Sequence, residues 1–439
     1  MKTLASLVLA LFMVATASSH DGTKPLIVGK VNCPYIPSIG GTLYLNISLT
    51  LPIVDRPSRK PMNLCVVLDR SGSMADERKI DYAKAALTTL IRQLSPRDIL
   101  SVVIYDDVVE VLRPATTLRD REQLLGRINE VFPRGSTNLG GGLIEGLQQV
   151  SRNSGTEYVN RVILFSDGLA NQGITDPHTL NSIVRRSRHQ GISVTTMGVG
   201  LDYNENLMAG LAEHGGGRYY FIESPRSIAH ILRREFDTMT AILAQNAVLE
   251  ITLGPGFRVA DVIGYTWEQT GNRCMIPLGD LAAGQTQEMT LELQAPEGKG
   301  RAEVAYGVLQ FTSDALASGQ AREFRTHVSY TQDQVLVDKN RDMEVQAKAD
   351  VAVSTRTVEQ ALESFDRGDA DGAVRALEVA REAIAASPAA GASGTGQILD
   401  EQQRRLEEFS KTLKDRDIDA RRAKKSIQYE NYKQQKNNN

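Results

Sequence analysis

The sequence contains few of the residues that build several common kinds of site. Among its 439 residues are three cysteines, six histidines and one tryptophan, with no Cys-x-x-Cys pair and no zinc-like histidine spacing. A structural zinc site needs closely spaced Cys and His ligands, so the sequence argues against this class of protein. The formal net charge is only −3. A chain without a strong basic excess has no electrostatic reason to bind nucleic acid, and we expect no such partner.

Long apolar runs are also scarce, and the one near the start of the chain has the features of a secretion signal. Lys2 and Thr3 are followed by LASLVLALFMVATA, which ends in the small-x-small sequence Ala15-Thr16-Ala17. The run is too short to span a membrane comfortably, and small residues at its end are typical of a signal-peptidase site. We therefore expect residues 1–19 to be a signal peptide. The mature protein is expected to be exported, to a periplasm or out of the cell, without an integral membrane segment.

The three cysteines leave one question open. Disulfides form and persist in the oxidising surroundings of an exported protein. Cys65 lies in the apolar stretch NLCVVLD and is expected to be a small buried hydrophobic residue. Cys33 and Cys274 remain as a pair that either forms a disulfide or stays reduced, and the sequence does not decide between these states.

Residues 61–244 alternate between apolar strands and amphipathic helices. The strands NLCVVLD, DILSVVIYD and RVILFSD are almost continuously apolar, and helical stretches such as ERKIDYAKAALTTLIRQL separate them. This pattern predicts a doubly wound, mostly parallel α/β sheet that is covered on both faces. A helix is expected over residues 225–244, at the end of this domain. Asp106 and Asp107 end one strand and are expected at an exposed hairpin end, with a second ion site as the alternative.

The regions on both sides of this domain have the pattern of short antiparallel strands. GTLYLNISLTLPI in residues 20–60, and AVLEITLG, QEMTLELQAP and RAEVAYGVLQFT in residues 245–335, are closely spaced and separated by Gly, Pro and Asn. Such spacing is typical of a β-sandwich. We infer that the two regions form one antiparallel sandwich into which the α/β domain is inserted. A disulfide between Cys33 and Cys274 would fit this arrangement.

The C-terminal part of the chain is predicted to be helical. Residues 336–390 have the pattern of a helical hairpin around a Gly-Asp turn. Residues 391–439 are expected to form a flexible Gly/Ala/Ser linker followed by a charged helix. From Glu401 onward the chain carries eleven basic and seven acidic residues, a local net charge of +4. We expect this tail to be a solvated helix, with contact to anionic lipid or a cell-wall polymer as the alternative.

Oxygen-bearing side chains follow the first core strand at every second position. NLCVVLD ends in Asp69, and Ser71 and Ser73 follow it. Thr137 lies in a Gly-rich loop that opens a helix, and Asp167 ends the strand VILFSD. In an open α/β sheet, ligands bind at the carboxyl ends of the strands. Because carboxylate, hydroxyl and water oxygens suit a hard divalent cation such as Mg²⁺, these five residues predict a metal site.

The same residues resemble a known cation site. Asp69-x-Ser71-x-Ser73, Thr137 and Asp167 match, in order, the metal-ion-dependent adhesion site of von Willebrand factor type A domains. The resemblance implies that the three hydroxyl groups bind the ion and that the two carboxylates bind it partly through water. It also implies an open coordination position for an Asp or Glu of a partner protein. Mg²⁺ is the expected ion, with Mn²⁺ or Ca²⁺ as alternatives.

The overall arrangement resembles secreted bacterial proteins that carry a type A domain in a β-sandwich. We therefore predict a cation-dependent protein-binding module, for adhesion or assembly, and not an enzyme. One alternative is a hydrolase that uses the ion as a Lewis acid, which would need a general base near a metal-bound water. Both carboxylates are assigned to the ion, and the three loops contain no histidine. The other alternative is a scaffold that acts mainly through its helical tail.

Overall fold

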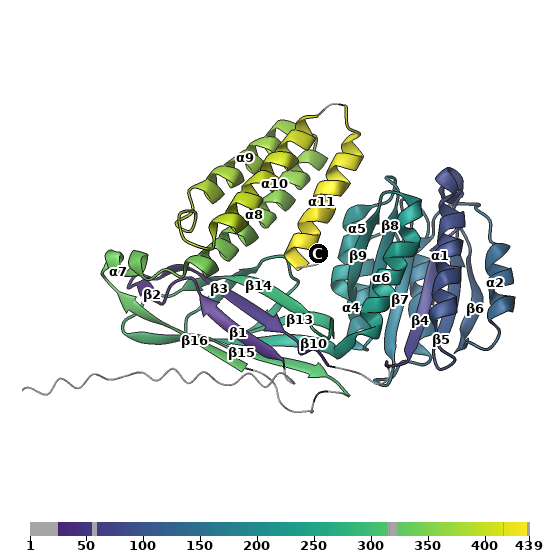
Figure 1. Ribbon diagram of the computed structural model, residues 1–439, viewed down its shortest axis with the longest axis horizontal. Coiled ribbons are helices and arrows are strands. Elements are labelled where there is room, and N and C mark those ends of the chain that lie inside the picture. The colour runs from purple at the N-terminus through teal and green to yellow at the C-terminus, as the bar shows by residue number, and fades with distance from the viewer. Residues whose placement is uncertain (1–24, 55–58, 315, 317–322, 416, 437–439) are drawn as a thin grey trace, which may run out of the picture.

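A computed structural model describes residues 25–54, 59–314, 316, 323–415 and 417–436 of the protein (Figure 1). The predicted signal peptide, residues 1–19, lies outside these residues. Within the described part of the chain, no helix is long and apolar enough to cross a membrane. The structure consists of an α/β domain, a β-sandwich beside it and a helical region above the sandwich in the view of Figure 1. This arrangement confirms the predicted fold class.

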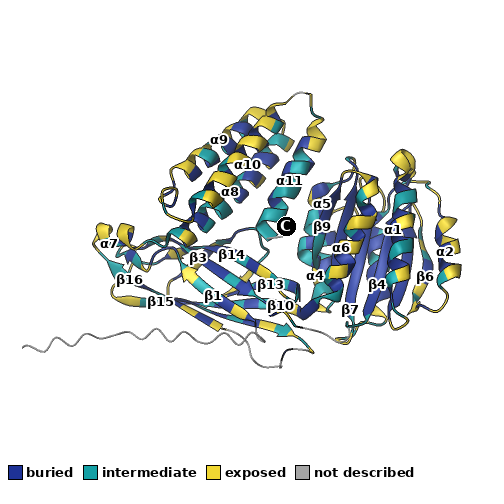
Figure 2. Ribbon diagram, in the orientation of Figure 1, coloured by how far each residue is buried: buried dark blue, intermediate teal, exposed yellow. Residues whose placement is uncertain are grey.

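The α/β domain is built on a six-stranded, mostly parallel sheet. Its strands are β4 (Met62–Asp69), β5 (Ile99–Tyr105), β6 (Val109–Thr117), β7 (Val159–Ser166), β8 (Ser193–Val199) and β9 (Gly216–Ile222). Their order across the sheet is β6-β5-β4-β7-β8-β9, and only the pair β5–β6 is antiparallel. β4, β5, β7 and β8 are buried along their whole length (Figure 2). Such complete burial requires helices on both faces of the sheet.

Six α-helices provide this cover. They are α1 (Lys79–Gln93), α2 (Arg121–Asn129), α3 (Leu139–Ser151), α4 (Pro177–His189), α5 (Glu205–Gly215) and α6 (Ile228–Thr240). Successive strand residues point to opposite faces, so Val66 packs with α1, α2 and α6 whereas Val67 packs with α3, α4 and α5. α6 ends at Thr240, short of the predicted end at Ala244. The reason is that Ile242 and Ala244 already pair with a strand of the sandwich.

Two mostly antiparallel sheets form the sandwich from strands on both sides of the α/β domain. The first sheet contains, in order, β1 (Leu26–Val31), β3 (Gly41–Thr50), β14 (Thr286–Ala295) and β11 (Arg258–Val262). The second contains, in order, β12 (Glu268–Thr270), β13 (Arg273–Ala282), β10 (Ile242–Leu253), β15 (Arg301–Thr312), β16 (Glu323–Thr331) and β2 (Tyr35–Pro37). β3 pairs with β14 along its whole length, and the two sheets share one apolar core. The α/β domain is therefore inserted into the sandwich, as predicted.

All three cysteines are buried and free. The thiol of Cys33 donates a hydrogen bond to the carbonyl of Val337 at 3.2 Å, whereas Cys274 lies within β13. The disulfide that the sequence left open is therefore not formed. Burial raises the pKa of the Cys65 and Cys274 thiols to about 12. Both thiols are protonated at neutral pH and behave as small hydrophobic groups.

The helical region differs from its prediction at the C-terminal end. Its helices are α7 (Gln334–Lys339), α8 (Met343–Asp366), α9 (Ala370–Ala385), α10 (Gly396–Lys414) and α11 (Ala420–Lys436). α8 and α9 form the predicted hairpin. The expectation of one solvated helix from Glu401 is wrong, because α10 ends at Lys414 and α11 packs against the α/β domain (Figure 1). Buried Lys425 of α11 pairs with Glu205 at the start of α5, and from Ala423 to Lys436 every residue of the helix is buried or half-buried.

Candidate metal-binding site

The five predicted site residues lie on three loops at the carboxyl end of the central strands. Asp69 is the last residue of β4, and Ser71 and Ser73 lie at the start of the 3₁₀ helix η1 (Gly72–Arg78). Thr137 precedes α3, and Asp167 follows β7, the neighbour of β4. Asp69, Ser71, Thr137 and Asp167 are at most 4% exposed, and Ser73 is half-buried.

The Asp69 carboxylate has a fixed orientation because hydrogen bonds reach both of its oxygens. Oδ1 accepts the backbone N–H of Ser71 at 2.8 Å. Oδ2 accepts the hydroxyl groups of Tyr105 and Ser166, each at 3.1 Å. Tyr105 lies opposite Asp69 in the β4–β5 register, so the ends of two neighbouring strands supply this support.

Hydroxyl groups connect the first loop to the other two. Ser73 Oγ donates to Asp167 Oδ1 at 2.8 Å and lies 3.3 Å from Ser71 Oγ. A Cβ atom placed on Gly168 would lie 3.4 Å from Thr137 Oγ1 and 3.6 Å from Ser73 Oγ. Both hydroxyl groups therefore border the same position, beside Gly168. The structure brings together the oxygen atoms of all five predicted residues.

Lys79 belongs to the same cluster, although the sequence pattern identified it only as a helical residue. It is the first residue of α1, and its Nζ donates to Asp167 Oδ2 at 2.8 Å. Its side chain is only 5% exposed. Glu77 and Arg78, immediately before it, have φ angles of 51° and 58°. This left-handed conformation is unfavourable for non-glycine residues. The turn formed by these two residues directly precedes α1, and it therefore sets the position of Lys79 at the start of that helix.

A second ionic cluster fixes the neighbouring loops. Asp106 and Asp107 lie in the turn of the β5–β6 hairpin, and Asp107 is exposed as predicted, but Asp106 is fully buried. Its Oδ2 accepts the Nε–H groups of Arg70 and Arg134, each at 2.8 Å. The backbone N–H of Arg134 also donates to the Arg70 carbonyl at 2.7 Å, and that of Asn138 donates to the Asp106 carbonyl at 2.8 Å. These bonds tie the Ser71 loop to the loop that carries Thr137.

The electrostatics of the cluster favour a positive occupant. Burial, and secondly the negative charge of Asp167, raise the pKa of Asp69 to about 6. Burial also raises the pKa of the Tyr105 hydroxyl well above its ordinary value, so this group stays a hydrogen-bond donor. Two neighbouring buried carboxylates repel each other, and a cation between them would relieve both the repulsion and the cost of desolvation.

The residues present fit a hard divalent cation. The cluster offers two carboxylates and three hydroxyl groups, and oxygen ligands of this kind suit Mg²⁺ and related ions. Among the described residues, no group of three or more His, Cys, Asp or Glu side chains is arranged to hold a metal. The mixed cluster of carboxylates and hydroxyl groups is therefore the candidate site in the described part of the chain.

Comparison with known proteins assigns the α/β domain to a family. Residues 63–234 match the family of the von Willebrand factor type A domain. This part of the chain is a von Willebrand factor type A domain. The chain is 29% identical over 238 residues to the uncharacterized protein YfbK of Escherichia coli, a match that covers 53% of this chain and 41% of YfbK. It is 26% identical over 347 residues to the uncharacterized protein sll0103 of Synechocystis, covering 76% and 81% of the two chains.

A further relative is the inter-alpha-trypsin inhibitor heavy chain H1 of Sus scrofa. It is 26% identical over 196 residues, which cover 43% of this chain and 22% of the heavy chain. The chain therefore spans less than half of the length of YfbK and about a fifth of the length of the heavy chain.

Two solved structures share the fold of this chain, including the parts outside the type A domain. A von Willebrand factor type A protein from Catenulispora acidiphila superposes with a TM-score of 0.73 at 16% identity, covering 94% of this chain and 98% of that one. The ArnB paralog VWA2 from Sulfolobus acidocaldarius has a TM-score of 0.63 at 17% identity, covering 94% and 99%. At these identities the likeness shows the fold alone, and it extends over the sandwich and the helices.

The supporting residues of the site are hard to find in the sequence. Tyr105 has the pattern of the last apolar residue of a strand, and Ser166 that of an ordinary strand residue. Asn171, whose Oδ1 accepts the backbone N–H of Thr137 at 2.9 Å, has the pattern of a loop residue. One signal was available for Tyr105, because neighbouring strands that end together place their last side chains at the same edge.

Proposed function

We propose that this protein is a binding module that holds a divalent cation, Mg²⁺ above all, at its type A domain. The ligands would be Asp69, Ser71, Ser73, Thr137 and Asp167, and a bound cation would offer a coordination position to an Asp or Glu of a partner protein. The observation that carries the proposal is that these five side chains, from three loops, meet at one edge of the sheet: Ser73 links Ser71 to Asp167, Ser71 N–H links to Asp69, and Thr137 and Ser73 both lie beside Gly168.

The charge of the cluster supports its use for acidic partners. Two carboxylates contribute −2, and the buried ammonium of Lys79 contributes +1, which leaves −1. A divalent cation would therefore bring the net charge of the cluster, Lys79 included, to +1. Such an excess in a partly buried site attracts a carboxylate strongly, because the effective dielectric constant there is low.

The surroundings of the cluster support a protein as the partner. Large apolar side chains are exposed on the loops next to the site: Val108 53%, Phe132 60%, Leu169 58% and Ile174 39%. They lie in the β5–β6 turn, in the loop before Thr137 and in the loop after Asp167. Exposed apolar side chains near a polar centre are common at protein-binding surfaces.

We propose binding and not catalysis as the role of the site. Both carboxylates are engaged by hydrogen bonds within the cluster, and the three loops contain no histidine that could act as a general base. We also propose that the protein is exported to a periplasm or out of the cell, on the basis of the apolar N-terminal sequence.

The test is capture of partner proteins by the immobilised full-length protein, with Mg²⁺ and after chelation. We expect specific partners to be retained only with Mg²⁺, and Thr137→Ala and Ser71→Ala to lose them. Ser101→Ala is a matched control, because this buried hydroxyl lies in β5 and donates to the Leu64 carbonyl away from the site. Capture that survives both chelation and Thr137→Ala would contradict the proposal and would favour a scaffold that acts through its helices.

A further inference from the structure

A cavity lies between the α/β domain and the sandwich, on elements that do not carry the metal-site residues. It has a volume of about 650 Å³ and is lined by the C-terminal ends of α4 and α5, by β10 and β13, and by the residues just before β12. This volume is within the usual range for pockets that bind small molecules, roughly 300–1,000 Å³. The cavity is therefore large enough for a ligand of its own.

The two walls of the cavity differ in chemistry. The α/β domain contributes basic side chains, and the sandwich contributes mostly apolar ones. The basic residues are Arg185, Arg188, His189 and His214, and the apolar ones include Val248, Trp267, Met275 and Pro277. Among the described residues that line the cavity, Glu268 is the only acid, and it pairs with Arg185 at 3.4 Å. A ligand with an acidic end and an apolar body would match both walls.

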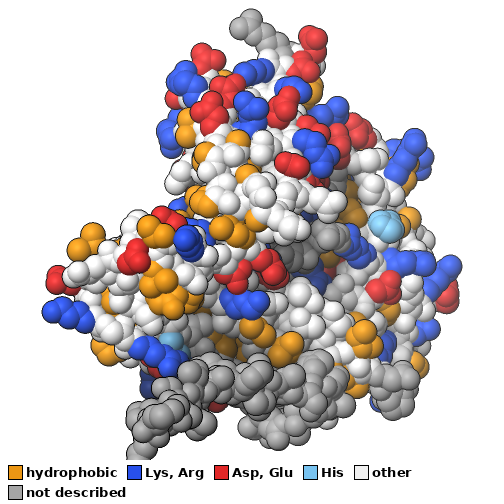
Figure 3. Space-filling model, turned by 60° about the vertical axis from the view of Figure 1, so that its left-hand side comes forward, with side chains coloured by type: hydrophobic (Ala, Val, Ile, Leu, Met, Phe, Trp, Pro, Cys, Tyr) orange, Lys and Arg blue, Asp and Glu red, His pale blue; other side chains and the backbone are white. Residues whose placement is uncertain are grey.

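Arg188 is a half-buried cation that has no ion pair within the described part of the chain. Its guanidinium donates a hydrogen bond to the backbone carbonyl of Glu213 at 3.3 Å. The negative charges of Glu213 and Asp280 act on it, but each carboxylate has a closer cation. Lys436 pairs with the first of them, and Arg161 pairs with the second at 3.0 Å. Unlike the basic side chains of the helical region, which are interspersed with acidic ones (Figure 3), Arg188 keeps N–H donors for a further partner.

Two glycines from different domains leave the space in which the Arg188 guanidinium lies. A Cβ atom placed on Gly216 would lie 2.7 Å from Arg188 Nε, and one placed on Gly279 would lie 3.5 Å from an Nη atom of the same side chain. Gly216 ends α5 with a φ angle of 68°, and Gly279 lies in β13 with a φ angle of 78°. Burial at this place lowers the pKa of the guanidinium, so a negative partner would stabilise its charge.

We propose that this cavity binds a small organic acid, with the carboxylate on Arg188 and the apolar body against Trp267. A guanidinium suits a carboxylate because it donates two parallel hydrogen bonds. Trp267 is half-buried, and its indole ring offers a flat surface for an apolar group. Met275 and Pro277 of β13 extend this apolar wall. Because each domain supplies one wall, an occupant would contact both domains at once.

The experiment is titration of the full-length protein with 3-phenylpropanoate, followed by the fluorescence of Trp267, the one tryptophan of the chain. We expect saturable binding at micromolar to millimolar concentration. The neutral amide 3-phenylpropanamide has the same apolar body without the charge, and it should bind at least tenfold more weakly. Calorimetry replaces fluorescence for Trp267→Ala, which should bind the acid at least fivefold more weakly because the apolar wall is lost.

Variants of neighbouring arginines test the carboxylate end of the site. Arg188→Met should weaken the binding of 3-phenylpropanoate at least tenfold and abolish the preference for the acid over the amide. Arg186→Met is the matched control, because Arg186 is exposed on the same helix and is not among the described residues that line the cavity. It should change the affinity less than twofold. Circular dichroism verifies that each variant is folded.

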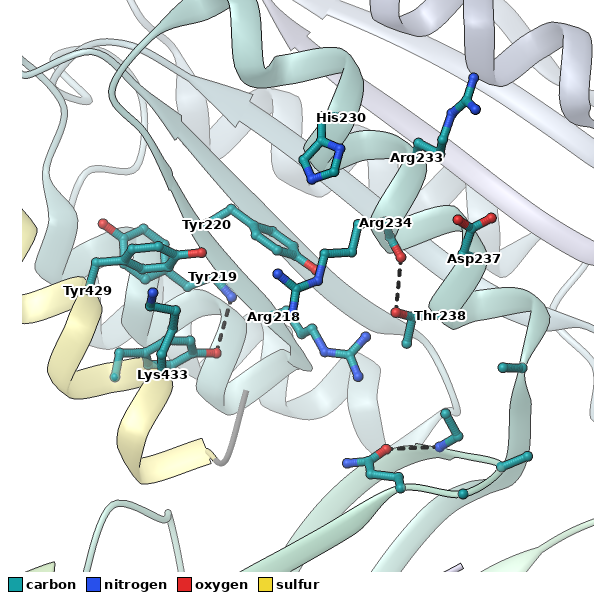
Figure 4. A pocket seen from close by; sticks show the side chains of 16 residues that line it. Arg218, Tyr219, Tyr220, His230, Arg233, Arg234, Asp237, Thr238, Tyr429 and Lys433 are labelled. Atoms are coloured by element: carbon teal, nitrogen blue, oxygen red, sulfur yellow. Dashed lines mark hydrogen bonds between the residues drawn. The ribbon is translucent and has the colours of Figure 1, made fainter. Parts of the chain in front are cut away.

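A different cavity with basic side chains provides a second control. It is lined by β9, α6 and α11 and contains, among others, Arg218 and Lys433 (Figure 4). Lys433→Gln should change the affinity for 3-phenylpropanoate less than twofold if the acid binds beside Trp267. Absence of binding by the folded wild-type protein, or equal affinities for the acid and the amide, would overturn the proposal. A loss in Arg186→Met or Lys433→Gln as large as that in Arg188→Met would also overturn it.

Discussion

At the scale of single residues, the protonation of Asp69 makes both the stability of the protein and its affinity for a cation depend on pH. Its pKa of about 6 lies above the ordinary value, chiefly because of burial. The folded protein therefore keeps this proton more tightly than the unfolded chain. In the metal-free protein, protonated Asp69 therefore contributes to the free energy of unfolding at low pH, and this contribution is lost as the pH rises through about 6.

A cation must displace this proton below pH 6. We expect the Mg²⁺ affinity to be nearly constant above about pH 7 and to fall roughly tenfold per pH unit below about pH 6. Calorimetric titration at several pH values measures this dependence. An affinity that does not change between pH 5 and pH 7 would contradict the assignment of Asp69 as a ligand.

Lys79 is expected to limit the affinity for the cation. Its ammonium neutralises Asp167 at 2.8 Å and repels a second positive charge. Lys79→Met should raise the Mg²⁺ affinity roughly tenfold, while the metal-free protein loses about 3 kcal/mol of stability because a buried carboxylate is left unpaired. Calorimetry and urea unfolding measure the two effects. Exposed Arg92 on the same helix provides the control Arg92→Met, and equal behaviour of the two variants would refute this role of Lys79.

At the scale of elements, α11 is held to the α/β domain by ion pairs of different burial. Lys425 pairs with Glu205 in a buried position, with side-chain exposures of 3% and 11%, whereas Arg421 pairs with Asp202 at 61% and 56%. Loss of one partner of a buried pair costs about 3–5 kcal/mol, but an exposed pair contributes at most about 1 kcal/mol. Lys424 also pairs with Glu205, so Lys425→Met leaves this carboxylate one partner but removes the donor to the Tyr203 carbonyl. We expect a loss of about 1–3 kcal/mol in urea unfolding, against less than about 1 kcal/mol for Arg421→Met. The reverse order would show that α11 is not docked through Lys425.

The packing of α11 also shows where sequence reasoning fails. Eleven basic residues in the tail indicated a solvated helix. The partners that bury it, Glu205 for Lys425 and Tyr219 for the ring of Tyr432, lie far away in the sequence. Charge patterning describes one helix at a time and contains no information about such distant partners.

The α/β sheet, and the meeting of the five proposed site residues at one of its edges, were predictable for the opposite reason. Continuous apolar strands such as β4 require cover on both faces, and the strand ends then meet at one edge wherever the helices lie. Lys79 escaped prediction because its position depends on the left-handed turn at Glu77 and Arg78. Neither Glu nor Arg prefers the left-handed conformation, so the local sequence does not predict this turn.

At the scale of the whole molecule, the type A domain has its own two apolar cores, and the sandwich has a separate one. Residues 59–241 alone should therefore fold and bind Mg²⁺ with the affinity of the full-length protein. The fragment should be less stable, because contacts such as the 3.0 Å pair between Arg161 and Asp280 of the sandwich are lost. Circular dichroism melting and calorimetry test both statements. A folded fragment that does not bind the cation would show that the site needs the rest of the chain.

Calorimetric titration of Mg²⁺ into the chelator-stripped, full-length protein at pH 7.5 is the decisive measurement for the cation site. We expect a single site, absent in Asp69→Ala and at least tenfold weaker in Thr137→Ala, with the affinity of Ser101→Ala unchanged. Absence of binding by the folded wild-type protein, or equal binding by wild type and Asp69→Ala, would contradict the assignment of these loops as a cation site.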